Sequence, residues 1–98
     1  MGWTVIKEDE NGKGMKTLPK DFQLSNLDIL YSGNFKVLKY IDPYGDTTFN
    51  SHMVADLLSD LNNLKSKLPT DSEQIEEVIE IANECAGQMH TYLKFYGE

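Results

Sequence analysis

The sequence predicts a single α+β domain spanning residues 1–98, in which a small antiparallel sheet from the N-terminal half packs against two antiparallel C-terminal helices. Short apolar stretches separated by turn-forming residues fill the first half, as is typical of strands joined by tight turns. The second half carries two apolar stripes at helical spacing, which predict two amphipathic helices. Of the 98 residues, 40% are apolar and 10% are aromatic, so one hydrophobic core is expected.

The N-terminal third predicts a hairpin. Residues 3–6 are aromatic and β-branched, as strands prefer. The turn-forming run 10–14 separates them from a short return strand at residues 15–18, which Pro19 ends. The apolar stretch 27–31 is left unassigned, so the strand order in this part of the chain stays open.

Residues 35–41 are expected to form the clearest strand, with both of its faces partly apolar. The segment 42–46, which reads Asp-Pro-Tyr-Gly-Asp, is rich in turn-forming residues, and Pro43 suits the first corner of a turn. Residues 46–49 then return as the partner strand. The sequence therefore predicts a second hairpin with its tip at 42–46.

Two helices complete the predicted fold. Asn50 or Ser51 is expected to cap the first, and Pro69 to end it. Its apolar stripe consists of Val54, Leu57, Leu58, Leu61, Leu64 and Leu68. Thr70 and Glu73 have the spacing of a capping box for the second helix. The second stripe consists of Ile75, Val78, Ile79, Ala82, Ala86, Met89, Leu93 and Tyr96, so this helix is expected to reach the end of the chain.

Charge and cysteine content narrow the classes of partner. The formal net charge is −7 and the isoelectric point about 4.7, so the surface repels nucleic acids and anionic membranes and favours a basic protein partner. Solubility alone is the competing explanation of this acidity. Cys85 is the single cysteine, and the first residues lack the pattern of a signal peptide, so a cytoplasmic protein is expected.

The sequence offers no set of residues for catalysis, and we expect neither an enzyme nor a cofactor or metal site. His52 and His90 have no partner ligands at the spacing of a metal site. Cys85 follows Glu84, whose charge would raise the pKa of a thiol rather than activate it. The run Gly12-Lys13-Gly14 is too short for a phosphate-binding loop. An unrecognised carboxylate site is the remaining route to an enzyme.

Two features lack an obvious structural purpose. The second helix carries five glutamates on its polar side, Glu73, Glu76, Glu77, Glu80 and Glu84, and like charges at this spacing destabilise a helix. The helix dipole explains Glu73, Glu76 and Glu77 better than it explains Glu80 and Glu84. Tyr44 at the predicted hairpin tip, together with Tyr92 and Phe95, could supply aromatic anchors for an interface.

The segment from Tyr40 to Asn50, two helices after it, and the ending from His90 to Glu98 resemble small bacterial immunity proteins of toxin–immunity systems, including contact-dependent inhibition. The resemblance covers residues 36–98. It implies a cytoplasmic inhibitor that binds its cognate toxin domain, here a basic, nuclease-type domain whose active cleft it would block. An acidic domain would fill such a basic cleft, with its carboxylates in place of the phosphates of the substrate.

Within this interpretation, the predicted partner-binding residues form two groups. The first lies on the second helix and comprises Glu76, Glu77, Glu80 and Glu84. The second lies at the predicted hairpin tip and comprises Asp42, Tyr44 and Asp46. The alternative function is a non-catalytic adaptor or structural domain, with a homodimer left open.

Overall fold

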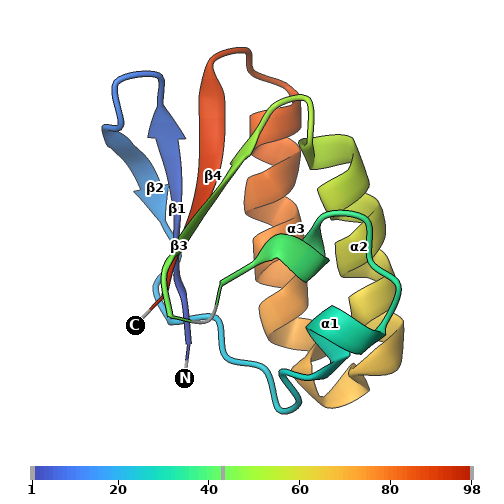
Figure 1. Cartoon of the computed structure of the whole chain (residues 1–98). Coiled ribbons are helices and arrows are strands. Elements are labelled where there is room, and N and C mark those ends of the chain that lie inside the picture. Colours follow the sequence, from blue (N-terminus) through green and yellow to red (C-terminus); the bar gives the residue numbers. More distant parts are fainter. Residues whose placement is uncertain (1, 43, 98) are drawn as a thin grey trace.

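A four-stranded antiparallel sheet lies against a pair of antiparallel helices in the computed structural model, which describes residues 2–42 and 44–97 (Figure 1). The strand order is β2-β1-β4-β3. Figure 1 shows the helices on one face of the sheet and no helix over the other face. The predicted α+β class with an antiparallel sheet is therefore confirmed, but the sheet does not come from the N-terminal half alone, since one strand is C-terminal and the strand predicted at residues 35–41 does not form.

The N-terminal hairpin forms as predicted. Strand β1 (Thr4–Asp9) pairs with β2 (Gly14–Thr17), and Gly12 takes a left-handed backbone with φ of 80° in the turn between them. The Asp9 carboxylate accepts hydrogen bonds from two backbone amides of this turn. The hairpin thus combines β-forming residues in its strands with a glycine and an aspartate where the chain reverses.

The prediction of a helix reaching the chain's end is wrong. Helix α3 (Ser72–Ala86) stops before Gly87, and β4 (Thr91–Tyr96) returns through the middle of the sheet between β1 and β3. His90 adopts a left-handed backbone with φ of 62° just before this strand. Along β4 the side chains alternate between buried and half-buried, which is the period of a strand. Gly97 therefore follows a strand and does not end a helix.

The predicted strand at residues 35–41 is also wrong. This segment is irregular and ends in the short 3₁₀ helix η1 (Leu38–Tyr40). Strand β3 (Asp46–Asn50) pairs with β4 instead, with Phe49 opposite Leu93. The 42–46 segment is consequently a link from η1 into an edge strand and not a hairpin tip, and Pro43 lies outside the described residues.

The two helices of the layer are α2 (Val54–Lys67) and α3, joined by the 3₁₀ turn η2 (Pro69–Asp71), so α2 ends before Pro69 as predicted. The Asn50 side chain accepts the amides of His52 and Met53 just ahead of α2. The predicted Thr70–Glu73 capping box does not form, because no side chain caps α3 by a hydrogen bond. A third, four-residue helix, α1 (Ile29–Ser32), lies in the segment between β2 and β3.

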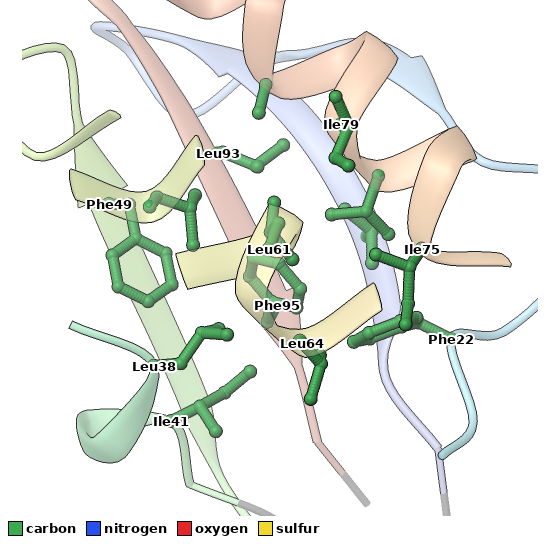
Figure 2. Close-up of a cluster of buried hydrophobic side chains, with 14 of the residues drawn as sticks. Phe22, Leu38, Ile41, Phe49, Leu61, Leu64, Ile75, Ile79, Leu93 and Phe95 are labelled. Carbon is green, nitrogen blue, oxygen red and sulfur yellow. The ribbon is translucent and has the colours of Figure 1, made fainter. Parts of the chain in front are cut away.

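Figure 2 shows the core, where apolar side chains from both layers meet. Phe95 of β4 is fully buried, and its ring lies 5.6 Å from that of Phe49 and 6.1 Å from that of Phe22. Leu61 and Leu64 of α2 close over these rings (Figure 2). Among the described residues, none of the helices has the length and apolar character that a membrane span requires.

Candidate protein-interaction site

Helix α3 presents its glutamates away from the core because its apolar residues recur every three or four positions on the other side. We call the five residues Glu73, Glu76, Glu77, Glu80 and Glu84 the glutamate stripe. Three of them are exposed, while Glu77 and Glu84 are half-buried. The predicted helical acids therefore do share one surface, but their environments along the helix differ.

Glu84 is compensated within the chain by two lysines of the N-terminal hairpin. Its carboxylate lies 2.7 Å from the amine of Lys16 and 3.6 Å from that of Lys7, and Lys7 is only 5% exposed. The hydrogen bond from Lys16 lowers the pKa of Glu84, and the same bond raises the pKa of Lys16. Glu84 therefore ties α3 to the sheet and supplies a counter-charge for a buried ammonium group.

Glu76 is also paired within the chain. Its carboxylate forms an ion pair and hydrogen bond with Lys65, which projects from the neighbouring helix α2. Both groups are partly exposed, so this pair adds little to stability. The pair does place a positive charge next to Glu76, which weakens the attraction of that carboxylate for a basic partner.

The remaining acids of the helix form what we call the free acid stripe: Glu73, Glu77 and Glu80. None of the three makes an ion pair or a side-chain hydrogen bond with residues 2–42 or 44–97. Two of them, Glu77 and Glu80, were predicted as partner contacts, whereas Glu73 was explained by the helix dipole. The unpaired charge thus lies toward the N-terminal half of α3.

A groove that was not predicted from the sequence runs beside this stripe. It lies between the segment 18–22, which follows β2, and the first two turns of α3, and it encloses about 110 Å³. Leu18, Phe22 and Val78 form its apolar part, and Asp21, Glu73 and Glu77 supply acids. An aromatic residue inside a polar loop, Phe22, was the only signal of it in the sequence.

The 42–46 segment carries the second predicted group, and much of it is held by structural hydrogen bonds. The carbonyl of Asp42 accepts the indole N–H of buried Trp3 at 2.8 Å, and its carboxylate accepts the amide of Tyr44. Asp46 lies opposite Tyr96 in the sheet and is exposed. No hydrogen bond or ion pair within the described part of the chain joins this segment to α3.

The predicted aromatic anchors divide between surface and core. Tyr44 is 71% exposed, in agreement with the prediction. Phe95 is buried in the core and is therefore wrongly predicted as an anchor, since its position was assigned on a helix rather than a strand. Tyr92 lies half-buried on β4. Tyr31 and Tyr40, which were not predicted, are also exposed, and the Tyr31 hydroxyl donates to the carbonyl of Ile41, next to the 42–46 segment.

The residues with catalytic potential are not brought together. Cys85 is fully buried, and burial raises the pKa of its thiol, which disfavours the reactive thiolate. His90 is exposed with its Nδ1 3.5 Å from a carboxylate oxygen of Glu10. Within residues 2–42 and 44–97, no three histidine, cysteine or acidic side chains converge as a metal site requires.

Comparisons with protein-family models, with curated proteins and with solved structures found no match to this chain. The resemblance of residues 36–98 to immunity proteins therefore stays a prediction. The surface of α3 and the groove beside it are the features that point to a function.

Proposed function

We propose that this chain is a non-catalytic immunity-type protein, which binds a basic, nuclease-type toxin domain and blocks its active cleft. The observation that carries the proposal is the free acid stripe. It sets three carboxylates on one face of a rigid helix, next to a groove, and none of the three forms an ion pair with a described residue.

A nuclease must attract the phosphates of its substrate, so its cleft carries lysines and arginines. A protein of net charge −7 is steered toward such a cleft, which raises the association rate. The helix backbone that carries these carboxylates is already ordered, so the conformational entropy lost on binding is confined to the side chains. An acidic helix face can in this way occupy the place of the phosphates.

The free acid stripe also has a cost in the isolated protein. Like charges three or four residues apart on a helix destabilise it by about 0.2–0.5 kcal/mol per pair. Glu73 and Glu77 are four residues apart, and Glu77 and Glu80 are three apart. A basic partner would turn this repulsion into attraction, which is why we favour binding over solubility as its purpose.

The alternative is an adaptor or structural domain that forms a homodimer through the sheet face that no helix covers (Figure 1). That face carries the half-buried side chains of Ile6, Tyr92 and Tyr96. The Lys94 amine lies 4.6 Å from the Tyr96 ring centre, and the Tyr96 hydroxyl bonds the Glu8 carboxylate. Sedimentation equilibrium separates the two functions, because a tight homodimer with no second protein bound favours the alternative.

The deciding experiment uses the toxin domain encoded by the adjacent reading frame. Co-expression of this chain should protect cells from that domain, and the purified pair should bind. The variant Glu73→Gln with Glu77→Gln and Glu80→Gln should weaken affinity by about tenfold or more, because three charged contacts are lost.

The matched control removes the same amount of charge outside α3, by Glu10→Gln, Asp28→Asn and Asp56→Asn. These three side chains are exposed, and the control should reduce affinity by less than about threefold through the weaker long-range field. No binding of the wild-type chain at micromolar concentration, or equal loss in both variants, would overturn the proposal.

A further inference from the structure

The groove beside α3 is preformed, because both of its walls are fixed by backbone hydrogen bonds. On the wall formed by residues 18–22, the Leu18 amide donates to Val5 at 3.0 Å, and Trp3 and Phe22 exchange two backbone hydrogen bonds of 2.9 and 2.7 Å. The next residue is linked to the other wall, since the amide of Gln23 donates to the side-chain carbonyl of Gln74 at 2.9 Å. A ligand therefore meets a site that needs little ordering.

The inner part of the groove is apolar. Phe22 and Val78 are almost fully buried, and Leu18 is half-buried beside them. Figure 2 shows Phe22 against Ile75, so the ring is held from behind by the core. The volume of about 110 Å³ is well above the roughly 10–15 Å³ that one water needs, so the space admits a side chain with an alkyl stem.

The outer part of the groove is acidic on both sides. Asp21 comes from one wall, and Glu73 and Glu77 come from the other. The Asp21 carboxylate accepts a hydrogen bond from the Thr4 hydroxyl at 3.3 Å, which orients it. Lys20 also lines the groove, yet it forms no ion pair with any described residue, so the three carboxylates keep their charge available.

The ligand chemistry follows from these two zones. A metal ion is disfavoured, because within residues 2–42 and 44–97 no three acidic, histidine or cysteine side chains converge on one point. An organic cation with an apolar stem can place the stem in the inner, apolar part of the groove and its charge beside the outer carboxylates. Arginine fits better than lysine, because its planar group has five donors that can reach carboxylates on opposite walls.

We propose that this groove binds an arginine side chain of the partner, with the stem along the half-buried Leu18, above the buried Phe22 and Val78, and the guanidinium between Asp21 and the glutamates of α3. The inference rests on the proposed function and names the chemical group that the toxin would present. It also gives a role to two of the unpaired acids, Glu73 and Glu77, which line the groove.

The test uses the complete chain and a small probe, the peptide acetyl-Gly-Arg-Gly-amide, followed by two-dimensional ¹⁵N–¹H NMR. The amide signals of Phe22, Gln23 and Val78 should shift saturably, with a dissociation constant of about 1–10 mM, since few atoms make contact. The same peptide with citrulline, which has the same shape and no charge, should bind at least about fivefold more weakly. Equal binding of both peptides, or shifts that do not involve these residues, would overturn the inference.

Variants separate the groove from general acidity. Glu77→Gln should weaken binding of the arginine peptide by about fivefold, because it removes a charged acceptor from the rim. Lys20→Gln should strengthen binding by about twofold, because it removes the one cation of the groove. Glu10→Gln, an exposed acid on the β1–β2 turn, should leave binding within about 1.5-fold of wild type, and a drop as large as that of Glu77→Gln would contradict the proposal.

The outcome is distinct from that of the proposed function. If the chain binds and neutralises the toxin domain but ignores the arginine peptide, the groove inference is wrong and the function stands. If the peptide binds at the groove but no toxin domain binds, the groove stands and the proposed function is wrong.

Discussion

At the scale of single residues, two buried aspartates hold the long irregular segment between β2 and β3. Asp60 of α2 is 2% exposed, and its carboxylate accepts the backbone amides of Lys36, Val37 and Leu38 at 2.8–3.1 Å. Asp71 accepts the amide and the hydroxyl of Ser25. Part of the acidity of the chain is therefore structural, because these carboxylates satisfy amides that no sheet partner reaches.

Replacing Asp60 by asparagine should lower the free energy of unfolding by about 2–4 kcal/mol. The asparagine keeps the volume but loses the charge and one acceptor oxygen, so at least one buried amide is left unpaired. Urea unfolding followed by circular dichroism measures this change. Asp56→Asn on the same helix is the control, since its pair with Lys36 is exposed, and it should change stability by less than about 0.5 kcal/mol. Equal effects of the two substitutions would refute the role of Asp60.

The ion pair of Glu84 with Lys16 should make the stability of the protein depend on pH. Its pKa is lowered in the folded protein by the hydrogen bond from Lys16, so its contribution is present above its unfolded-state pKa. The contribution is lost as the pH falls through the folded-state pKa. Lys16 makes stability depend on pH in the alkaline range, because its pKa is raised in the folded protein. Its contribution to stability is present below its unfolded-state pKa and is lost as the pH rises through the folded-state pKa.

Glu84→Gln should therefore be less stable than wild type near neutral pH, and the difference should shrink as the solution is acidified. Denaturant unfolding at a series of pH values from neutral into the acid range measures it. Lys16→Gln should reproduce part of the loss, because it removes the same hydrogen bond. A difference between wild type and Glu84→Gln that does not change with pH would show that the carboxylate charge is not involved.

At the scale of elements, the first hairpin and helix α2 could be predicted from the sequence, because each has both a repeating pattern and a clear stop. The C-terminal strand could not. Leu93 and Tyr96 continue the helical spacing of α3, while Thr91, Leu93 and Phe95 have the spacing of a strand. Over six residues both periods fit. The pairing of β4 with β1 and β3 decides between them, and this is a contact that periodicity cannot show.

The prediction of a strand at residues 35–41 was wrong for a different reason. Phe35, Val37 and Ile41 are buried, so their assignment to the core was correct. Burial does not require a strand, however, because the amides of this segment bond the carboxylate of Asp60 instead of a neighbouring strand. The sequence shows where apolar side chains recur but not which acceptor takes the backbone amides.

The identity of β4 is tested by Phe95→Ala. A core residue in a central strand should cost about 3–5 kcal/mol when truncated, because a cavity is left among the rings of Phe22 and Phe49. Tyr92→Ala, on the same strand with a half-buried side chain, should cost clearly less. Thermal or urea unfolding measures both. If Tyr92→Ala proved more damaging than Phe95→Ala, the alternation along β4 would be wrong.

At the scale of the whole molecule, the acids fall into three groups by what their charge meets. Asp60 and Asp71 bond backbone and side-chain donors in the interior, and Glu76 and Glu84 meet lysines of the same chain. The acids of the free acid stripe form no ion pair or side-chain hydrogen bond with a described residue. The acidic helix face was predicted from the sequence, but its unpaired part is smaller than predicted, because Glu76 and Glu84 pair with lysines. The pair between Glu84 and Lys16 forms only when the hairpin packs on α3, so the sequence alone could not show it.

The groove could not be predicted for a similar reason. Its walls come from residues 18–22 and from α3, which are far apart in the sequence and lie side by side only in the folded chain. What the sequence did contain was the acidity of both walls. The folded chain adds the apolar floor, and with it a site for an extended cationic side chain rather than a diffuse negative field.

The most direct test of the central claim, that unpaired acids on α3 bind a basic partner, is the salt dependence of affinity. The dissociation constant for the neighbouring toxin domain is measured by calorimetry between about 50 and 500 mM NaCl, for wild type and for the variant Glu73→Gln with Glu77→Gln and Glu80→Gln. We expect wild-type affinity to fall steeply with salt, and the variant to bind more weakly with a shallower slope. The same affinity and the same slope for both proteins would contradict the claim.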